Sequence, residues 1–187
     1  MIHMEIINHK EISVKSLKKH LKNGEIIIYP TDTIYGLGCD ANNEEAIIHL
    51  REVKQNFHSP LSIIPPSKKW VLDNTTIKQV YIDSLPGPFT FIVKLKKKNA
   101  INKEISDSGT IGIRIPDHQF TKKIQATKIP VVTTSVNLHG MDPITNLKQI
   151  PQNFKKEISI AIDAGSLQNN PSIILDLTGT FAKIIRL

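Results

Sequence analysis

The chain has 187 residues, of which 40% are hydrophobic, so it can bury one core and is predicted to be a single α/β domain over residues 1–187. It has no apolar signal core and no stretch long enough to cross a bilayer, which excludes a membrane protein and predicts a cytoplasmic one. Its single cysteine, Cys39, excludes an internal disulfide, and its net charge of +7 favours anionic partners, whether polyanions or small molecules.

The N-terminal third is predicted to run strand, helix, strand, loop, helix. An apolar stripe at helical spacing with Gly24 as a stop predicts a helix over residues 12–22, and a strand over 25–29 follows it. The asparagine pair at 42–43 would cap a second helix that ends near Lys54.

The rest of the chain is predicted to contain more strands than helices. One further helix is expected over residues 75–84, before the stiff turn Leu85-Pro86-Gly87-Pro88. Strands are expected over residues 61–64, 89–95, 110–115, 130–134, 158–162, 172–177 and 181–187. The predicted fold is therefore one twisted, mostly mixed β-sheet with a few helices packed on it.

The segment from Tyr29 to Gly38 is the most informative part of the chain. It reads Tyr29-Pro30-Thr31-Asp32-Thr33-Ile34-Tyr35-Gly36-Leu37-Gly38 and follows a β-branched run. This pattern predicts an exposed polar loop at the carboxyl end of a buried strand, which is where open α/β sheets bind ligands. Gly36 and Gly38 would let the backbone approach a ligand closely.

Polar and cationic side chains recur at other predicted strand ends. Each has an alternative explanation as a turn cap, but together they suit a small polar molecule with a carboxylate or phosphate group. No nucleophile elbow, HExxH motif or Walker loop is present, which argues against a covalent or zinc hydrolase. His118 and His58 are the two histidines expected near a cleft. The strand-end set is Thr31, Thr33, Arg114, Ser135, Asn137, Asp163 and Ser172, with Lys54 and Arg186 close by.

Five segments form an ordered set of motifs: residues 29–38, Leu85-Pro86-Gly87-Pro88-Phe89-Thr90, Gly109-Thr110-Ile111-Gly112-Ile113-Arg114-Ile115-Pro116, Thr134-Ser135-Val136-Asn137-Leu138-His139-Gly140 and Pro171-Ser172-Ile173-Ile174-Leu175-Asp176. This set resembles the Y-P-T-[DE]-T-x-Y-G-L-G, P-G-P-x-T, [ST]-x-x-x-R-x-P, T-S-A-N-x-S-G and S-T-[IV]-[VI]-D motifs of the YrdC/TsaC threonylcarbamoyl-AMP synthases. The resemblance extends from about Glu25 to Arg186.

The resemblance implies a YrdC-like twisted sheet with a positively charged concave groove, and no C-terminal extension domain. It implies a nucleotidyltransferase that condenses L-threonine, bicarbonate and ATP to threonylcarbamoyl-AMP and pyrophosphate. That product serves the threonylcarbamoyladenosine (t6A) modification of tRNA, so the implied partner is the tRNA-modification machinery that receives the adenylate.

The resemblance also implies roles for individual residues. Thr31, Arg114 and Ser135 would bind threonine. Catalysis would be mostly positioning by Lys54 and Arg114, with Mg²⁺ bound through the ATP phosphates and no metal ligand from protein side chains. The implied ATP-binding residues are Lys54, Thr110, Asn137, Ser172 and Arg186.

One departure from the family pattern concerns the end of the second predicted helix. The family reads K-x-R there, whereas this chain reads Lys54-Gln55-Asn56, so ATP binding would be weaker or supported by Arg51 or another cation. Two other functions stay open, and the Asn56 departure supports the first. One is a noncatalytic protein of the same fold that binds double-stranded RNA or tRNA, and the other is a carbamoyl-transfer domain like those within larger YrdC-containing enzymes.

Overall fold

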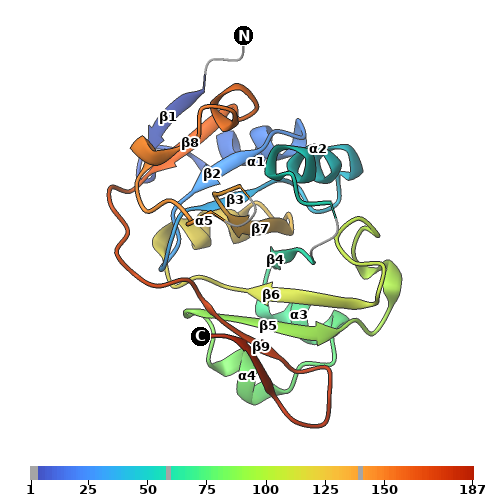
Figure 1. Cartoon of the computed structure of the whole chain (residues 1–187). Helices are drawn as coiled ribbons and strands as arrows, with labels where there is room; N and C mark the ends of the chain where they lie inside the picture. The colour runs from blue at the N-terminus through green and yellow to red at the C-terminus, as the bar shows by residue number, and fades with distance from the viewer. Residues whose placement is uncertain (1–3, 58–59, 139–140) are drawn as a thin grey trace.

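The computed structural model describes residues 4–57, 60–138 and 141–187. Its strands form one sheet in the order β1-β8-β2-β3-β7-β4-β6-β5-β9-β10 (Figure 1). The strands are β1 (Glu5–Asn8), β2 (Ile27–Tyr29), β3 (Gly36–Gly38), β4 (Ser62–Ile64), β5 (Phe89–Lys94), β6 (Thr110–Arg114), β7 (Val131–Ser135), β8 (Ile160–Asp163), β9 (Ile173–Asp176) and β10 (Lys183–Arg186).

Five α-helices and three short 3-10 helices connect these strands within the described residues. The α-helices are α1 (Val14–Lys22), α2 (Glu44–Lys54), α3 (Lys68–Asn74), α4 (Gln79–Asp83) and α5 (Gln119–Ala126). The 3-10 helices are η1 (Lys98–Ala100), η2 (Leu147–Gln149) and η3 (Phe154–Lys156). The longest helix, α2, has 11 residues, so no helix in the described part of the chain could span a bilayer.

The sheet is mixed, as predicted. Strand β8 pairs in parallel with both β1 and β2, and the pairs β4–β6 and β5–β9 are parallel as well. The pairs β2–β3, β3–β7, β4–β7, β5–β6 and β9–β10 are antiparallel. The predicted α/β class with a twisted mixed sheet and few helices is therefore confirmed.

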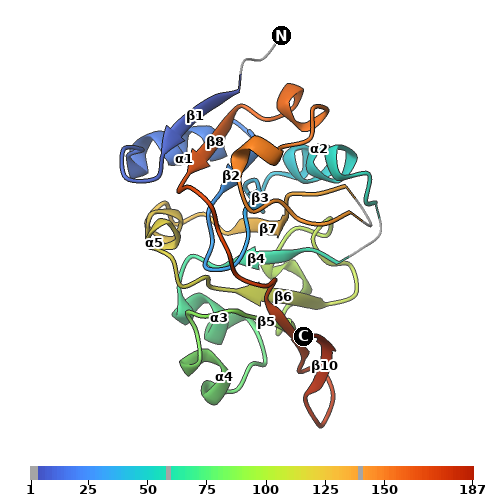
Figure 2. The same cartoon turned by 60° about the vertical axis from the view of Figure 1, so that its left-hand side comes forward.

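The two faces of the sheet are covered unequally. On one face, apolar side chains of the strands share a core cluster with buried residues of α2, α3 and α4. On the other face, α1 and α5 pack over β8, β2, β7 and β4, where they form a second core cluster. Figure 2 shows α1 and α5 on one side of the sheet and α2 on the opposite side. The second face continues beyond α1 and α5, over β6, β5 and β9.

Local capping explains where the first two α-helices begin. The Ser13 side chain accepts a hydrogen bond from the backbone N–H of Ser16, and the Asn43 side chain accepts one from Ala46. The apolar stripe of α1 places Leu17 and Leu21 in the core. Both helices were predicted within two residues of their observed bounds.

Two predictions of local structure are wrong. The segment after β2 is buried rather than exposed, because residues 36–38 form strand β3 between β2 and β7. The helix expected over residues 75–84 is limited to α4, since Thr75 ends α3 and its side chain accepts a hydrogen bond from Ile77 instead of continuing a helix. The sequence analysis missed α3 and α5.

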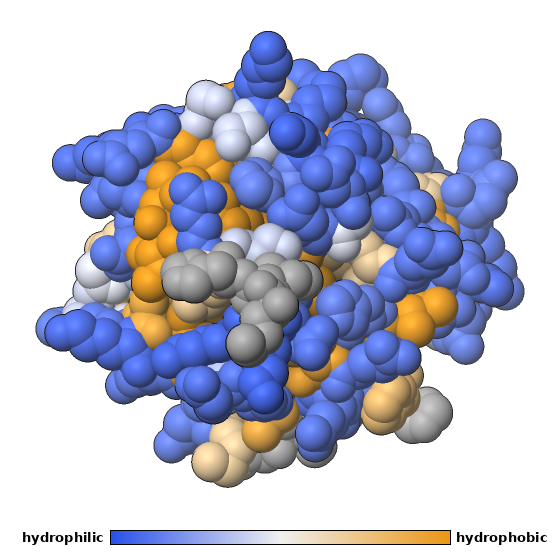
Figure 3. Space-filling model, turned by 90° about the horizontal axis from the view of Figure 1, so that it is seen from above, coloured by the Kyte–Doolittle hydropathy of each residue, from blue (hydrophilic) through white to orange (hydrophobic). Residues whose placement is uncertain are grey.

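The face of the molecule seen from above is mostly hydrophilic (Figure 3). Seen from above (Figure 3), hydrophilic residues cover most of the molecule, and hydrophobic ones are visible mainly in an area beside the grey atoms. Cys39 is fully buried, which is typical of a free cysteine that packs as a small hydrophobic residue.

Candidate functional site

The uncovered part of the second sheet face carries small polar side chains. Directly opposed residues of neighbouring strands project to the same face, and Ser62 lies opposite both Gly112 and Thr133. Thr90 lies opposite Arg114 on the adjacent strand pair. This part of the face therefore carries hydroxyls, a glycine and a guanidinium group, where the part under α1 and α5 carries apolar side chains.

A cavity of about 260 Å³ lies over this polar face. The lining residue Ser62 packs closely on Gly112, where a Cβ atom would lie 2.1 Å from the Ser62 Oγ. Arg114 and Arg186 are the charged side chains among the described residues that line the cavity. The full lining is Thr31, Thr33, Ile34, Tyr35, Gly36, Asn56, Pro60, Ser62, Thr90, Arg114, Thr133, Thr134, Ser135, Ser172, Ile174 and Arg186.

Arg114 is held at one corner of its guanidinium group. Its Nη2 donates to Asp32 Oδ1 at 2.8 Å, to Thr33 Oγ1 at 2.6 Å and to Thr31 Oγ1 at 3.3 Å. Burial lowers the pKa of Arg114, an effect that Asp32 opposes and the nearby Arg186 reinforces. The Nε and Nη1 atoms of Arg114 donate to no described residue. Every fully buried side-chain nitrogen among the described residues has a hydrogen-bond partner, so these two atoms must be in contact with solvent.

A second guanidinium lies across the cavity on β10. Arg186 donates from Nη2 to the Ser172 carbonyl at 2.8 Å and to the Ser172 Oγ at 3.3 Å. The Ser172 hydroxyl also lies 2.9 Å from Thr90 Oγ1. Partial burial lowers the pKa of Arg186. The two arginines and their hydroxyl partners thus present positive charge and polar groups to the same small volume.

Lys54 does not line the cavity but contacts the Ser135–Asn137 segment next to it. Its Nζ donates to the Ser135 carbonyl at 2.6 Å and to the carbonyl and side-chain oxygens of Asn137, both at 3.1 Å. The Ser135 hydroxyl lies 2.5 Å from Asn137 Oδ1. Burial lowers the pKa of Lys54 to about 8. The hydrogen bonds of Lys54 therefore hold the Ser135–Asn137 segment in place.

Two residues singled out in the sequence occupy different places. Asn56, where the family has arginine, lines the cavity with Arg114. Thr110 lies at the opposite end of β6 from Arg114 and lines a neighbouring cavity of about 370 Å³ together with Arg51. The two cavities share Pro60 in their walls.

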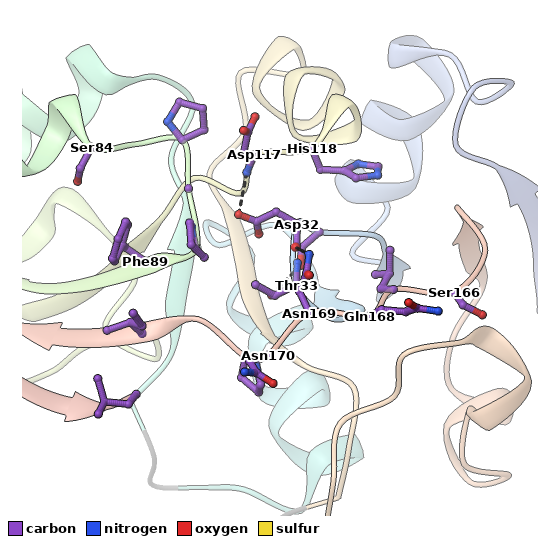
Figure 4. A pocket seen from close by; sticks show the side chains of 18 residues that line it. Asp32, Thr33, Ser84, Phe89, Asp117, His118, Ser166, Gln168, Asn169 and Asn170 are labelled. Atoms are coloured by element: carbon purple, nitrogen blue, oxygen red, sulfur yellow. Dashed lines mark hydrogen bonds between the residues drawn. The ribbon is translucent and has the colours of Figure 1, made fainter.

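A larger cleft of about 1080 Å³ adjoins the cavity on the other side of Thr31 and Thr33. Figure 4 shows Asp32 beside Asp117 in this cleft, and the Asp32 carboxylate accepts a hydrogen bond from the Asp117 backbone N–H at 3.1 Å. The segment between β8 and β9 forms another wall, and Asn169 donates from its side chain to the Asp32 carbonyl at 2.6 Å.

The structure brings most of the predicted site residues together. One cavity is lined by Thr31, Arg114, Ser135, Ser172 and Arg186. Lys54 and Asn137 do not line it, but both contact Ser135. The sequence analysis did not pair Asp32 with Arg114, although an acidic residue between two threonines after a strand could have signalled a partner for a strand-end arginine.

The remaining site predictions concern histidines and metals. His118 lines the larger cleft, as predicted, and burial lowers its pKa. His58 and His139 lie outside the described residues. No group of three metal-ligating side chains is present in residues 4–57, 60–138 and 141–187.

Comparison with known proteins gives a consistent result. The profile of the Sua5/YciO/YrdC family, described as "Telomere recombination", matches residues 19–187. A protein of Methanocaldococcus jannaschii that is provisionally named threonylcarbamoyl-AMP synthase is 36% identical over 167 residues, which cover 86% of this chain and 78% of that protein.

Two solved structures share the fold. P. abyssi Sua5, solved in complex with L-threonine, superposes with a TM-score of 0.86 at 23% identity over 98% of this chain. This chain spans only 57% of that protein's length. E. coli YciO superposes with a TM-score of 0.85 at 21% identity, with 100% of this chain and 95% of that one covered.

Proposed function

Because the chain belongs to the Sua5/YciO/YrdC family, we propose that it is an L-threonylcarbamoyladenylate synthase. One observation carries the proposal: residues from all five motif segments line the same cavity of about 260 Å³. Segments separated by more than a hundred residues in sequence thus converge on one polar volume with two arginines. The name of the M. jannaschii relative supports the same activity.

Threonine is proposed to bind between Arg114 and the hydroxyls of Thr31 and Ser135. The Nε and Nη1 atoms of Arg114 are available to a carboxylate, because Asp32 and the threonine hydroxyls hold only Nη2. Either N–H can donate a charge-assisted hydrogen bond to a carboxylate oxygen. The L-threonine complex of P. abyssi Sua5 is consistent with such a site in this fold.

ATP is proposed to bind with its phosphates toward Arg186 and Ser172, with Lys54 and Asn137 holding the adjoining backbone and Thr110 at the far end of β6. In the overall reaction the amine of threonine and bicarbonate form a carbamate with loss of water. A carbamate oxygen then attacks the α-phosphorus, and pyrophosphate leaves. Mg²⁺ would bind through the phosphates, and the arginines would neutralise the charge that develops during transfer.

The product would be passed to the machinery that forms t6A in tRNA, which we propose as the partner of this enzyme in the cytoplasm. The decisive experiment measures pyrophosphate release by the purified protein. Release is expected only when ATP, threonine and bicarbonate are all present. Serine lacks one methyl group and should be the poorer substrate by on the order of 1–3 kcal/mol in kcat/KM. Release without threonine, or equal turnover of both amino acids, contradicts a threonine-fitted site.

A second candidate function is supported by Asn56. A neutral amide lines the cavity where the family pattern has an arginine, which removes charge from a phosphate site. A noncatalytic RNA-binding protein of the same fold would tolerate this loss. Absence of pyrophosphate release, together with RNA binding that depends steeply on salt, would favour this second function.

A further inference from the structure

Asp32 is the residue at which three separate segments of the chain meet. Its Oδ1 accepts a hydrogen bond from Arg114 Nη2 at 2.8 Å, and its Oδ2 accepts one from the Asp117 backbone N–H at 3.1 Å. Its backbone carbonyl accepts a third, from the Asn169 side chain, at 2.6 Å. Figure 4 shows Asp32 between Asp117 and Asn169. One residue of the loop after β2 therefore holds the end of β6, the loop that follows it and the segment between β8 and β9.

Both oxygens of the Asp32 carboxylate are used inside the protein. The side chains of Asp32 and Arg114 are 11% and 8% exposed, so solvent screens this ion pair little. Asparagine has nearly the same shape as aspartate but only one acceptor oxygen, and its amide nitrogen is a donor. The substitution Asp32→Asn would therefore keep either the contact to Arg114 or the contact to Asp117, but not both.

The orientation of the Arg114 guanidinium is fixed at one atom. Nη2 is anchored, whereas Nε and Nη1 donate to no described residue and are in contact with solvent. Thr31 and Thr33 also accept hydrogen bonds from Nη2, at 3.3 and 2.6 Å. The buried ion pair with Asp32 adds a Coulomb attraction that these two hydroxyls lack. The orientation of this long side chain therefore depends most on Asp32.

We propose that Asp32 is a positioning residue that fixes which edge of the Arg114 guanidinium faces the cavity. The inference rests on the proposed function, in which Nε and Nη1 bind the carboxylate of threonine. A donor that is already oriented binds more tightly, because the ligand does not have to order it. Asp32 acts only through Arg114, since it lines the larger cleft and not the cavity and both of its oxygens already accept hydrogen bonds.

A purely electrostatic role for Asp32 predicts the opposite effect on binding. The negative charge of Asp32 repels the threonine carboxylate, so its removal should by itself increase the affinity for threonine. Loss of positioning should instead weaken binding by roughly 3- to 10-fold, which is the typical effect of having to order one long side chain. The sign of the change in affinity therefore separates the two roles.

The test compares Asp32→Asn with Asp117→Asn in the whole chain. Asp117→Asn removes an equal charge from the wall of the same cleft and keeps the backbone N–H that donates to Asp32. The Asp117 side chain is exposed and forms no hydrogen bond or ion pair with any described residue. Calorimetry measures the affinity of each protein for L-threonine, and circular dichroism checks that both variants fold. Asp32→Asn should bind threonine more weakly than the wild type, and Asp117→Asn should bind it equally well or slightly more tightly.

A second measurement follows Arg114 directly and needs no substrate. The chain has three arginines, so its nitrogen–proton spectrum contains three Nε–H signals, and Arg114→Lys identifies the signal of Arg114. Nitrogen relaxation at about pH 6 gives the order parameter of this group. The wild-type value should be about 0.85, and it should fall below about 0.6 in Asp32→Asn. It should stay at the wild-type value in Asp117→Asn.

Weaker threonine binding and a mobile Arg114 in Asp32→Asn alone would support the inference. An Arg114 side chain that is mobile in the wild type, or that stays rigid in Asp32→Asn, would overturn it, as would tighter threonine binding by Asp32→Asn. If Asp32→Asn does not fold, Asp32→Glu takes its place, because it displaces both oxygens by one methylene group and should change both measurements in the same direction. Absence of threonine binding by the wild type would contradict the proposed function instead, since the order parameter of Arg114 is measured without threonine.

Discussion

The ammonium group of Lys54 is buried beneath the Ser135–Asn137 segment. Replacing Lys54 with methionine should change how the free energy of unfolding depends on pH. Methionine fills a similar volume without the charge. In the wild type, burial lowers the pKa of Lys54 from 10.5 to about 8. The side chain is 5% exposed, so solvent screens this effect little.

The size and sign of the effect follow from proton linkage. A fall in pKa from 10.5 to about 8 corresponds to about 3.4 kcal/mol of destabilisation of the charged form. Three oxygen acceptors favour that charged form, so about 3.4 kcal/mol is an upper limit. Below pH 8 both the folded and the unfolded states keep the proton. Between pH 8 and 10.5 only the unfolded state keeps it, so the free energy of unfolding rises with pH in this window.

Urea unfolding of the wild type and of Lys54→Met at about pH 7.5, 9 and 10 measures this effect. The difference in unfolding free energy, wild type minus variant, should increase over this pH range by at most about 2.4 kcal/mol. Contributions from all other titrating groups cancel in the difference. Lys94→Met, at an exposed lysine, serves as the control and should give parallel curves. Parallel curves for Lys54→Met as well would refute the argument that burial dominates at this site.

Three further predictions concern the cavity and the sheet. Arg114→Ala should weaken threonine binding by about 1.5–3 kcal/mol with poor rescue by lysine, and unchanged affinity in calorimetry would exclude Arg114 as the carboxylate site. Asn56→Arg should tighten ATP binding several-fold, because a charged phosphate contact is worth about 1.5–3 kcal/mol against about 1 for a neutral one; an unchanged dissociation constant would mean that another cation already fills this role. Gly38→Ala should destabilise the fold by about 1–3 kcal/mol or more in urea unfolding, since its Cβ would lie 2.1 Å from the Val132 carbonyl oxygen, and wild-type stability would contradict that close approach.

Strands with dense β-branched residues and helices with clear caps could be predicted from the sequence. The strand predicted over 110–115 and the second helix match β6 and α2 closely, because each carries its own local signal. Residues 36–38 carry no such signal. Their strand forms because β2 and β7 lie on either side of them, which is a tertiary effect.

The membership of the site was predictable to a similar extent. The orientations of its side chains were not, because they too depend on tertiary packing. Residue types at strand ends identified Arg114, Ser135 and Ser172 as members of one site, and all three line the cavity. Sequence patterns do not fix which atoms point outward. The resemblance implied that Lys54 binds ATP; its ammonium group donates to two backbone oxygens and to Asn137 Oδ1, an orientation that depends on how α2 packs beside the end of β7.

The unequal covering of the sheet explains where the cavity lies. Helices α1 and α5 cover only part of the second face, and polar residues of the remainder line the cavity. The apolar sides of both helices are used in the core over β8, β2, β7 and β4, so neither helix extends over β6, β5 and β9. A sheet face that was covered completely would have no such cavity. The positions of these two helices therefore determine where a small molecule could reach the sheet.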